Sequence, residues 1–163
     1  MKKLLVMLLL IALCALPFTA QAATFNKFND FVEQVLTGKH DFTATGHVFK
    51  VFLTNELPLA ADTVKLDMAE ITTTFMSPSG EVDIQNTLSE TSGTATVAGT
   101  DVVWTASGGG FGPFRYVVLY NDSATSPTDA LVGWWDYGSS PTLASGETFT
   151  VDFDATNGII QAT

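Results

Sequence analysis

The hydrophobic positions of this chain follow two different periods, and the change between them predicts the fold class. Near the start, apolar residues recur every three or four positions, which is the period of an amphipathic helix. These residues are Phe25, Phe28, Phe31, Val32, Val35 and Leu36. Thr24 or Asn26 can cap the start of such a helix, and Gly38 can end it in the left-handed conformation. We therefore predict one amphipathic helix at about residues 25–37.

After Gly38 the apolar residues alternate with polar ones, as they do in β-strands. Short strands separated by turn residues indicate a mainly β chain, folded as an antiparallel β-sandwich of the jelly-roll or Ig-like kind. The segments that alternate or are rich in apolar residues are 48–53, 82–88, 95–97, 102–104, 115–120, 131–137, 148–153 and 159–160.

The segments between these strands carry weaker signals. Residues 64–68 fit either a strand or a helix, and residues 121–129 have the composition of a polar loop around Pro127. Asn157-Gly158 is a dipeptide favoured in tight hairpins, so we expect a hairpin between residues 148–153 and the last short strand.

Residues 1–22 have the pattern of a secretory signal peptide. Lys2 and Lys3 precede an almost unbroken apolar run, and Ala20-Gln21-Ala22 places small residues at a cleavage motif. A membrane anchor would need about 20 apolar residues, and this run is shorter. We therefore predict cleavage after Ala22, export to the periplasm or the extracellular space, a single domain over residues 23–163, and no membrane association after cleavage.

The composition excludes two classes of protein. Hydrophobic residues make up 46% of the chain, which is too many for a disordered acidic tail. Cleavage would remove two of the seven basic residues and none of the 17 acids, which changes the formal charge from −10 to −12. Nucleic-acid binding needs clustered lysine and arginine, so we expect no nucleic-acid partner. Cys14 would also be removed, and the exported chain would be unable to form an internal disulfide.

The sequence contains no motif that marks an enzyme. It has no phosphate-binding loop, paired-cysteine motif, His-Glu-x-x-His or G-x-S-x-G. His40 and His47 fit ordinary surface or edge positions better than catalytic ones. Asp152, Asp154 and Asn157 resemble a calcium loop only faintly, because the spacing is one residue too long, so hairpin acids are the better interpretation. We predict a protein that is not an enzyme and has no cofactor and no metal.

The second half of the chain is rich in aromatic residues. Neighbouring side chains on a strand point to opposite faces, so Trp134 and Trp135 cannot both face one core. Core packing and contacts with another molecule both remain open for this set. Arg115 is the one arginine, and it fits a structural salt bridge or an inter-subunit contact. Our candidate interface or ligand contacts are Trp134, Trp135, Tyr137, Arg115 and Phe111.

Three segments of the second half carry a resemblance to a known family: GPFRYVVLYND at 112–122, GWWDYGSS at 133–140 and GETFTVDFD at 146–154. Residues 24–29, 51–55 and 69–71 add to it. Together they resemble a family of small structural proteins of tailed bacteriophages. The resemblance implies a virion structural protein, either a capsid decoration protein or a tail-associated protein. Such proteins normally carry no export signal, and residues 1–22 depart from the family in this respect.

The resemblance and the missing catalytic motifs lead to one function and one alternative. We predict a non-enzymatic structural or assembly protein that docks repeatedly on itself or on a virion lattice, and that is located in the virion if the resemblance holds. The helix and the aromatic strands would supply the buried contacts. The alternative is a secreted glycan-binding β-sandwich module, in which exposed aromatic rings stack on sugars.

Overall fold

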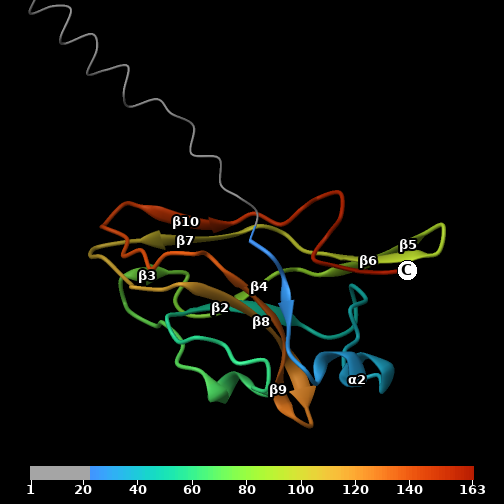
Figure 1. Ribbon diagram of the computed structural model, residues 1–163. Helices are drawn as coiled ribbons and strands as arrows, with labels where there is room; N and C mark the ends of the chain where they lie inside the picture. The colour runs from blue at the N-terminus through green and yellow to red at the C-terminus, as the bar shows by residue number, and fades with distance from the viewer. Residues whose placement is uncertain (1–22) are drawn as a thin grey trace, which may run out of the picture.

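The computed structural model describes residues 23–163, which form a mainly β structure of antiparallel sheets (Figure 1). The predicted signal peptide, with its cleavage site at Ala20 and Ala22, lies outside the described residues. The helical segments are α2 (Phe31–Leu36) and the short 3-10 helix η1 (Lys65–Asp67). Within residues 23–163, no helix has the length and apolar character that crossing a bilayer would require. The strands are β1 (Asn26–Lys27), β2 (Phe49–Thr54), β3 (Met76–Ser77), β4 (Val82–Asp83), β5 (Thr87–Thr91), β6 (Thr94–Ala98), β7 (Val102–Ala106), β8 (Tyr116–Thr125), β9 (Thr128–Asp136), β10 (Thr148–Val151) and β11 (Ile160–Ala162).

The strands are arranged in three sheets. A five-stranded sheet has the order β1-β9-β8-β2-β4, and two three-stranded sheets have the orders β10-β7-β3 and β11-β6-β5. The β10-β7-β3 sheet lies over the five-stranded sheet, and the β5–β6 hairpin extends to one side of this body (Figure 1). All of the pairs within these sheets are antiparallel. The predicted fold class, mainly β and antiparallel with a sandwich-like arrangement, is confirmed.

Strand β8 is buried on both faces, as its alternating sequence predicts. Val117 and Leu119 join the larger apolar cluster, which also contains Trp104 of β7 and lies between the two layers. Val118 and Tyr120 join a second cluster on the opposite face of the five-stranded sheet. The other members of this second cluster are Phe28, Phe52, Met68 and Leu131, with Trp134 packed against it.

The helix begins later than predicted. Residues 25–28 are not helical, because Asn26 and Lys27 pair with Trp134 and Gly133 to form β1. α2 then covers Phe31–Leu36, and Gly38 follows it with a φ of +73°, as expected for the end of a helix. Tertiary packing explains the difference: Phe25 and Phe28 are held by aromatic partners on β9, so helical spacing does not decide their conformation.

The predicted polar loop at 121–129 is wrong. Strand β8 continues to Thr125 and β9 begins at Thr128, so this segment forms a hairpin with irregular register. A β-ladder is built from backbone groups, and polar side chains do not prevent it.

Two predictions about strand connections are also wrong. Asn157-Gly158 does not join a hairpin, because β10 pairs with β7 whereas β11 pairs with β6. The turn therefore carries the chain from one sheet to another. Residues 82–88 do not form one strand, because β4 pairs with β2 and β5 pairs with β6. Residues 64–68, which fit a strand or a helix, form η1 and an isolated bridge from Val64 to Ala130.

Candidate functional site

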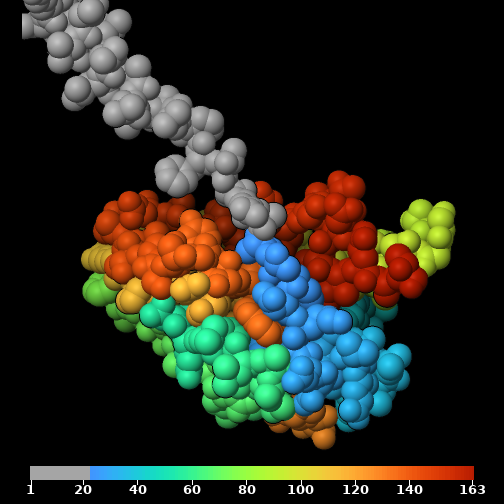
Figure 2. Space-filling view, viewed as in Figure 1, coloured from blue at the N-terminus to red at the C-terminus, as the bar shows by residue number. Residues whose placement is uncertain are grey.

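A groove opens where the edges of the two facing sheets meet. It lies between the β1–β9 edge of the five-stranded sheet and strand β10, and its volume is about 560 Å³. Figure 2 shows the N-terminal segment in blue between β9 in orange and the C-terminal residues in red. The groove is lined mainly by apolar and aromatic side chains, which are Phe25, Val117, Trp135, Phe149, Val151, Phe153 and Ile159.

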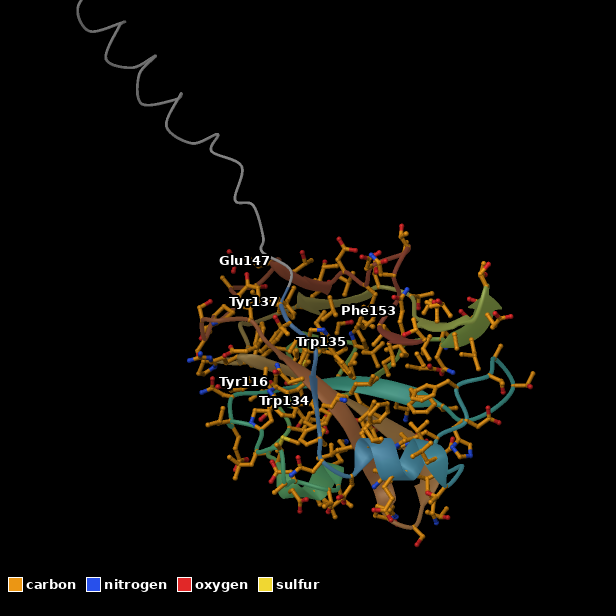
Figure 3. The ribbon with its side chains drawn as sticks, turned by 45° about the vertical axis from the view of Figure 1, so that its right-hand side comes forward. Tyr116, Trp134, Trp135, Tyr137, Glu147 and Phe153 are labelled. Atoms are coloured by element: carbon orange, nitrogen blue, oxygen red, sulfur yellow. The ribbon has the colours of Figure 1, made fainter. Side chains whose placement is uncertain are left out.

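The two adjacent tryptophans lie on opposite faces of β9, as predicted (Figure 3). Trp135 lines the groove, with its ring centre 5.0 Å from that of Phe25 and 5.7 Å from that of Phe153. Trp134 packs against Phe28 at 4.6 Å on the other face. Both indoles are half-buried within this chain. Their partners Phe25 and Phe28 flank β1, so the tryptophan pair anchors the N-terminal strand.

Tyr137 and Arg115 lie at the rim of the groove and just beyond it. Tyr137 is 52% exposed, and its ring meets Phe149 edge-on at 5.2 Å. The Arg115 guanidinium donates two hydrogen bonds to Asp136, of 2.8 and 2.9 Å. This pairing holds the pKa of Asp136 below its usual value, and the Gly138 N–H donates to the same carboxylate. Of the two roles left open for Arg115, the structure contains the salt bridge.

Phe111 does not lie with the other candidates. Its side chain is buried and stacks on Phe114 at 5.7 Å, and its backbone bridges to Leu143. In this chain Phe111 is therefore part of the core rather than of an accessible surface.

The groove has acidic side chains and no basic ones among the described residues that line it. The Asp154 carboxylate is already hydrogen-bonded within the chain. It accepts hydrogen bonds from the backbone N–H groups of Thr156 and Asn157 and from the side-chain amide of Asn157. These hydrogen bonds, those from Asn157 first, lower the pKa of Asp154. Asp154 thus stabilises the turn before β11. Asp152, the other acid that lines the groove, does not stabilise this turn. Within residues 23–163, no group of three or more His, Cys, Asp or Glu side chains could hold a metal ion.

The two histidines belong to a cluster that the sequence did not predict. His40 is buried rather than on the surface, and His47 is half-buried. The Asn121 side-chain nitrogen lies 3.0 Å from His40 Nδ1, 2.9 Å from His47 Nδ1 and 3.0 Å from the Lys39 carbonyl oxygen. The Ser123 N–H donates to Asn121 Oδ1, which orients the amide in this way. Asn121 follows Val117 and Leu119 at two-residue steps along β8, so the alternation of this strand was the signal that could have predicted a buried Asn121.

A second surface feature is the apolar side of α2. The helix buries Phe31 and the polar Gln34, while Val32, Val35 and Leu36 are exposed, with Leu36 82% exposed. An amphipathic helix packed on its own core would have buried all of these apolar residues. The segment 55–67 also has exposed leucines, and its Ala60 carbonyl accepts a hydrogen bond from the Asn29 N–H, two residues before α2 begins. We name the following residues the α2 face: Val32, Val35, Leu36, Leu57, Leu59 and Leu66.

A charged cluster fixes the 55–67 segment in this position. Lys65 Nζ lies 2.7 Å from Glu70 and 3.3 Å from Glu81, and 5.3 Å from the centre of the Tyr120 ring. Burial raises the pKa of the Glu70 carboxyl, whereas Lys65 opposes that rise. Because Lys65 points into the protein, its neighbour Leu66 lies in solvent and is 91% exposed.

Comparison of the chain with protein-family models, with curated proteins and with solved structures found no match. The groove and the α2 face are therefore interpreted from their own geometry, and the resemblance to structural proteins of tailed phages stays a prediction.

Proposed function

We propose that this protein is a non-enzymatic assembly protein, of the kind found as capsid decoration or tail-associated proteins in phage virions. The observation that carries the proposal is that α2 leaves three of its four apolar side chains exposed, although Phe31 is buried. α2 buries the amide of Gln34 and leaves Val32, Val35 and Leu36 in contact with water. A helix in a lone globular protein normally turns its apolar side toward the core.

The energetics favour a partner for this face. Burying a leucine side chain contributes about 1.5 to 3 kcal/mol relative to leaving it exposed. The α2 face holds two valines and a leucine on one short helix and three leucines on segment 55–67, all of them exposed, and exposed apolar patches on soluble proteins commonly mark interaction sites. The partner of the proposal is a second copy of this chain, placed repeatedly in a lattice. The chain as a whole carries an excess of acids, which favours solubility.

The test compares Leu36→Lys with a matched control, Val103→Lys. Both replace an exposed apolar residue with lysine, and Val103 lies on β7. The purified protein is expected to self-associate in sedimentation velocity as its concentration rises. We expect Leu36→Lys to weaken that association at least tenfold and Val103→Lys to leave it unchanged, because a lysine in the contact is desolvated without a partner.

Thermal unfolding of Leu36→Lys should match that of the wild type, since Leu36 makes few contacts within the chain. A protein that stays monomeric at the highest soluble concentration, or two variants that behave alike, would refute the proposal.

The alternative of a glycan-binding module has less support. Stacking on sugars needs open ring faces, but Trp134 packs against Phe28, and Trp135 packs against Phe25 and Phe153. Tyr137 alone of the three is mostly exposed.

A further inference from the structure

We propose that the groove beside β10 binds an extended peptide segment of a partner protein, one that alternates apolar and basic side chains and adds as a new strand to the β10-β7-β3 sheet. This proposal extends the assembly function to a second surface. It is carried by the unpaired edge of β10, by the apolar groove beneath that edge and by the charge of the groove.

One edge of the β10 backbone is unpaired within residues 23–163. This strand is the last in its sheet and pairs only with β7 among the described residues. The Ala106 N–H donates to the Glu147 carbonyl at 2.9 Å, which marks residue 147 as facing β7. Hydrogen-bonded positions alternate along an antiparallel pair, so Phe149 and Val151 also bond to β7. The N–H and C=O groups of Thr148, Thr150 and Asp152 consequently point away from β7.

The groove lies under this free edge. Thr150 and Asp152 line it together with the inward-facing Phe149 and Val151, although side chains of neighbouring residues point to opposite faces. The edge of the strand is therefore part of the groove wall. An incoming strand would bond to the backbone of Thr150 and Asp152 and insert every second side chain over Trp135, which is the arrangement of β-strand addition.

The edge of β10 is short, at four residues, and follows an irregularity at Gly146 and Glu147, but the strand itself lacks the other features that usually prevent such pairing. Natural proteins protect edge strands with lysine, proline, a bulge or a covering segment. β10 has the sequence Thr-Phe-Thr-Val, with neither lysine nor proline. Its pairing with β7 is regular across all four residues, so it contains no bulge.

The charge of the groove selects the partner. Asp152 and Asp154 are the charged side chains that line it, and the exported chain would carry a formal charge of −12. An acidic segment would be repelled from these carboxylates, whereas a basic segment is attracted.

The test uses synthetic seven-residue peptides as probes, binding to the purified protein. The first alternates valine and lysine, the second alternates valine and glutamate, and the third is the valine–lysine peptide with alternate backbone nitrogens methylated. Binding is followed by calorimetry and by the backbone amide signals of Thr150 and Asp152. We expect the first peptide to bind, with affinity that falls as salt rises, and the other two to bind at least tenfold more weakly.

Two variants give a matched comparison. Thr150→Pro and Thr148→Pro each remove an N–H that points away from β7, so the existing ladder is preserved in both. Only Thr150 lines the groove. We expect Thr150→Pro to weaken binding at least tenfold and Thr148→Pro to leave it within about twofold. Near-ultraviolet circular dichroism checks that both are folded, and Asp152→Asn, which changes no backbone group, should weaken binding and flatten its salt dependence.

The outcomes separate this proposal from the assembly function. Equal binding of the lysine and glutamate peptides, equal effects of the two proline variants, or binding of maltohexaose or chitohexaose but no peptide would overturn it. Leu36→Lys should bind the lysine peptide as the wild type does. If self-association is present and no peptide binds, the groove proposal fails alone; if the peptide binds and the protein never associates, the α2 proposal fails alone.

Discussion

Replacing Gly133 with valine is expected to lower the free energy of unfolding by about 2 to 3 kcal/mol, because the side chain would occupy space that β1 already fills. Gly133 pairs with Lys27 of β1 on one side and with Leu119 of β8 on the other. A Cβ atom there would collide with the Phe25 ring and would lie 2.6 Å from the Asn26 carbonyl oxygen. The backbone of a paired strand cannot move aside without breaking the ladder.

A double-mutant cycle in urea denaturation checks this explanation. If the Phe25 ring is the main obstacle, Gly133→Ala should cost clearly less in a Phe25→Ala background than in the wild type. The Asn26 carbonyl remains in both backgrounds, so some cost should persist. Equal costs in the two backgrounds would show that the ring is not the obstacle and that β1 is not held as described.

The same variant bears on the groove. Phe25 packs on Trp135 and lines the groove, so displacing β1 removes one of its walls. We expect Gly133→Val to lose binding of the valine–lysine peptide together with the N-terminal strand. The glycine is thus required for the seating of β1 and, through β1, for the shape of the candidate site.

The parts of the fold that the sequence predicted are those in which one strand carries its own signal. The alternation at 115–120 correctly indicated that β8 is buried on both faces, and the alternation at 148–153 correctly indicated which side chains of β10 point inward. In both cases burial repeats every second residue, so a local pattern is sufficient.

The errors arise where partners distant in the sequence decide the structure. Phe25 and Phe28 have helical spacing, but aromatic partners more than a hundred positions away hold them on a strand. Asn157-Gly158 has the chemistry of a hairpin turn, but each flanking strand finds a partner in a different sheet. Turn chemistry specifies how the chain bends and does not specify which strands it joins.

The candidate site was predictable to a similar extent. The aromatic set named Trp135 and Tyr137, which do lie at the groove, but no local pattern indicates that the free edge of β10 comes to lie beside β9. The histidine cluster was missed for the same reason, since Asn121 is more than 70 positions from either ring.

The second large effect is a loss of stability in mild acid that depends on His40. Burial, together with the smaller effect of the charge of His47, lowers the pKa of His40 to about 4. The unfolded chain has an ordinary histidine pKa of about 6.5, so between these values it binds a proton that the folded chain does not. Stability is therefore complete above pH 6.5 and falls as the pH drops toward 4, by at most about 3 kcal/mol.

The surroundings of His40 explain this loss of stability in acid and suggest a variant that should lack it. The His40 ring lies among Phe31, Phe42 and Phe49, at 5.7 to 5.9 Å between ring centres, and its Nε2 atom is buried without a partner. Asn121 has two hydrogens for three acceptors, so it can lose His40 and still donate to His47 and Lys39. His40→Phe should consequently leave stability at pH 7 nearly unchanged.

Urea denaturation between pH 7 and pH 4 provides the measurement. The carboxylates titrate in every variant, including the exposed Asp41, whose pKa the hydrogen bonds from Thr43 lower. The free energy of unfolding of the wild type minus that of His40→Phe isolates the histidine. This difference should be near zero at pH 7 and should become increasingly negative as the pH falls, so that the variant is the more stable protein in acid. His47→Gln is the control, because it keeps the buried ring and should retain most of the slope. Parallel curves for wild type and His40→Phe would mean that the acid sensitivity lies elsewhere.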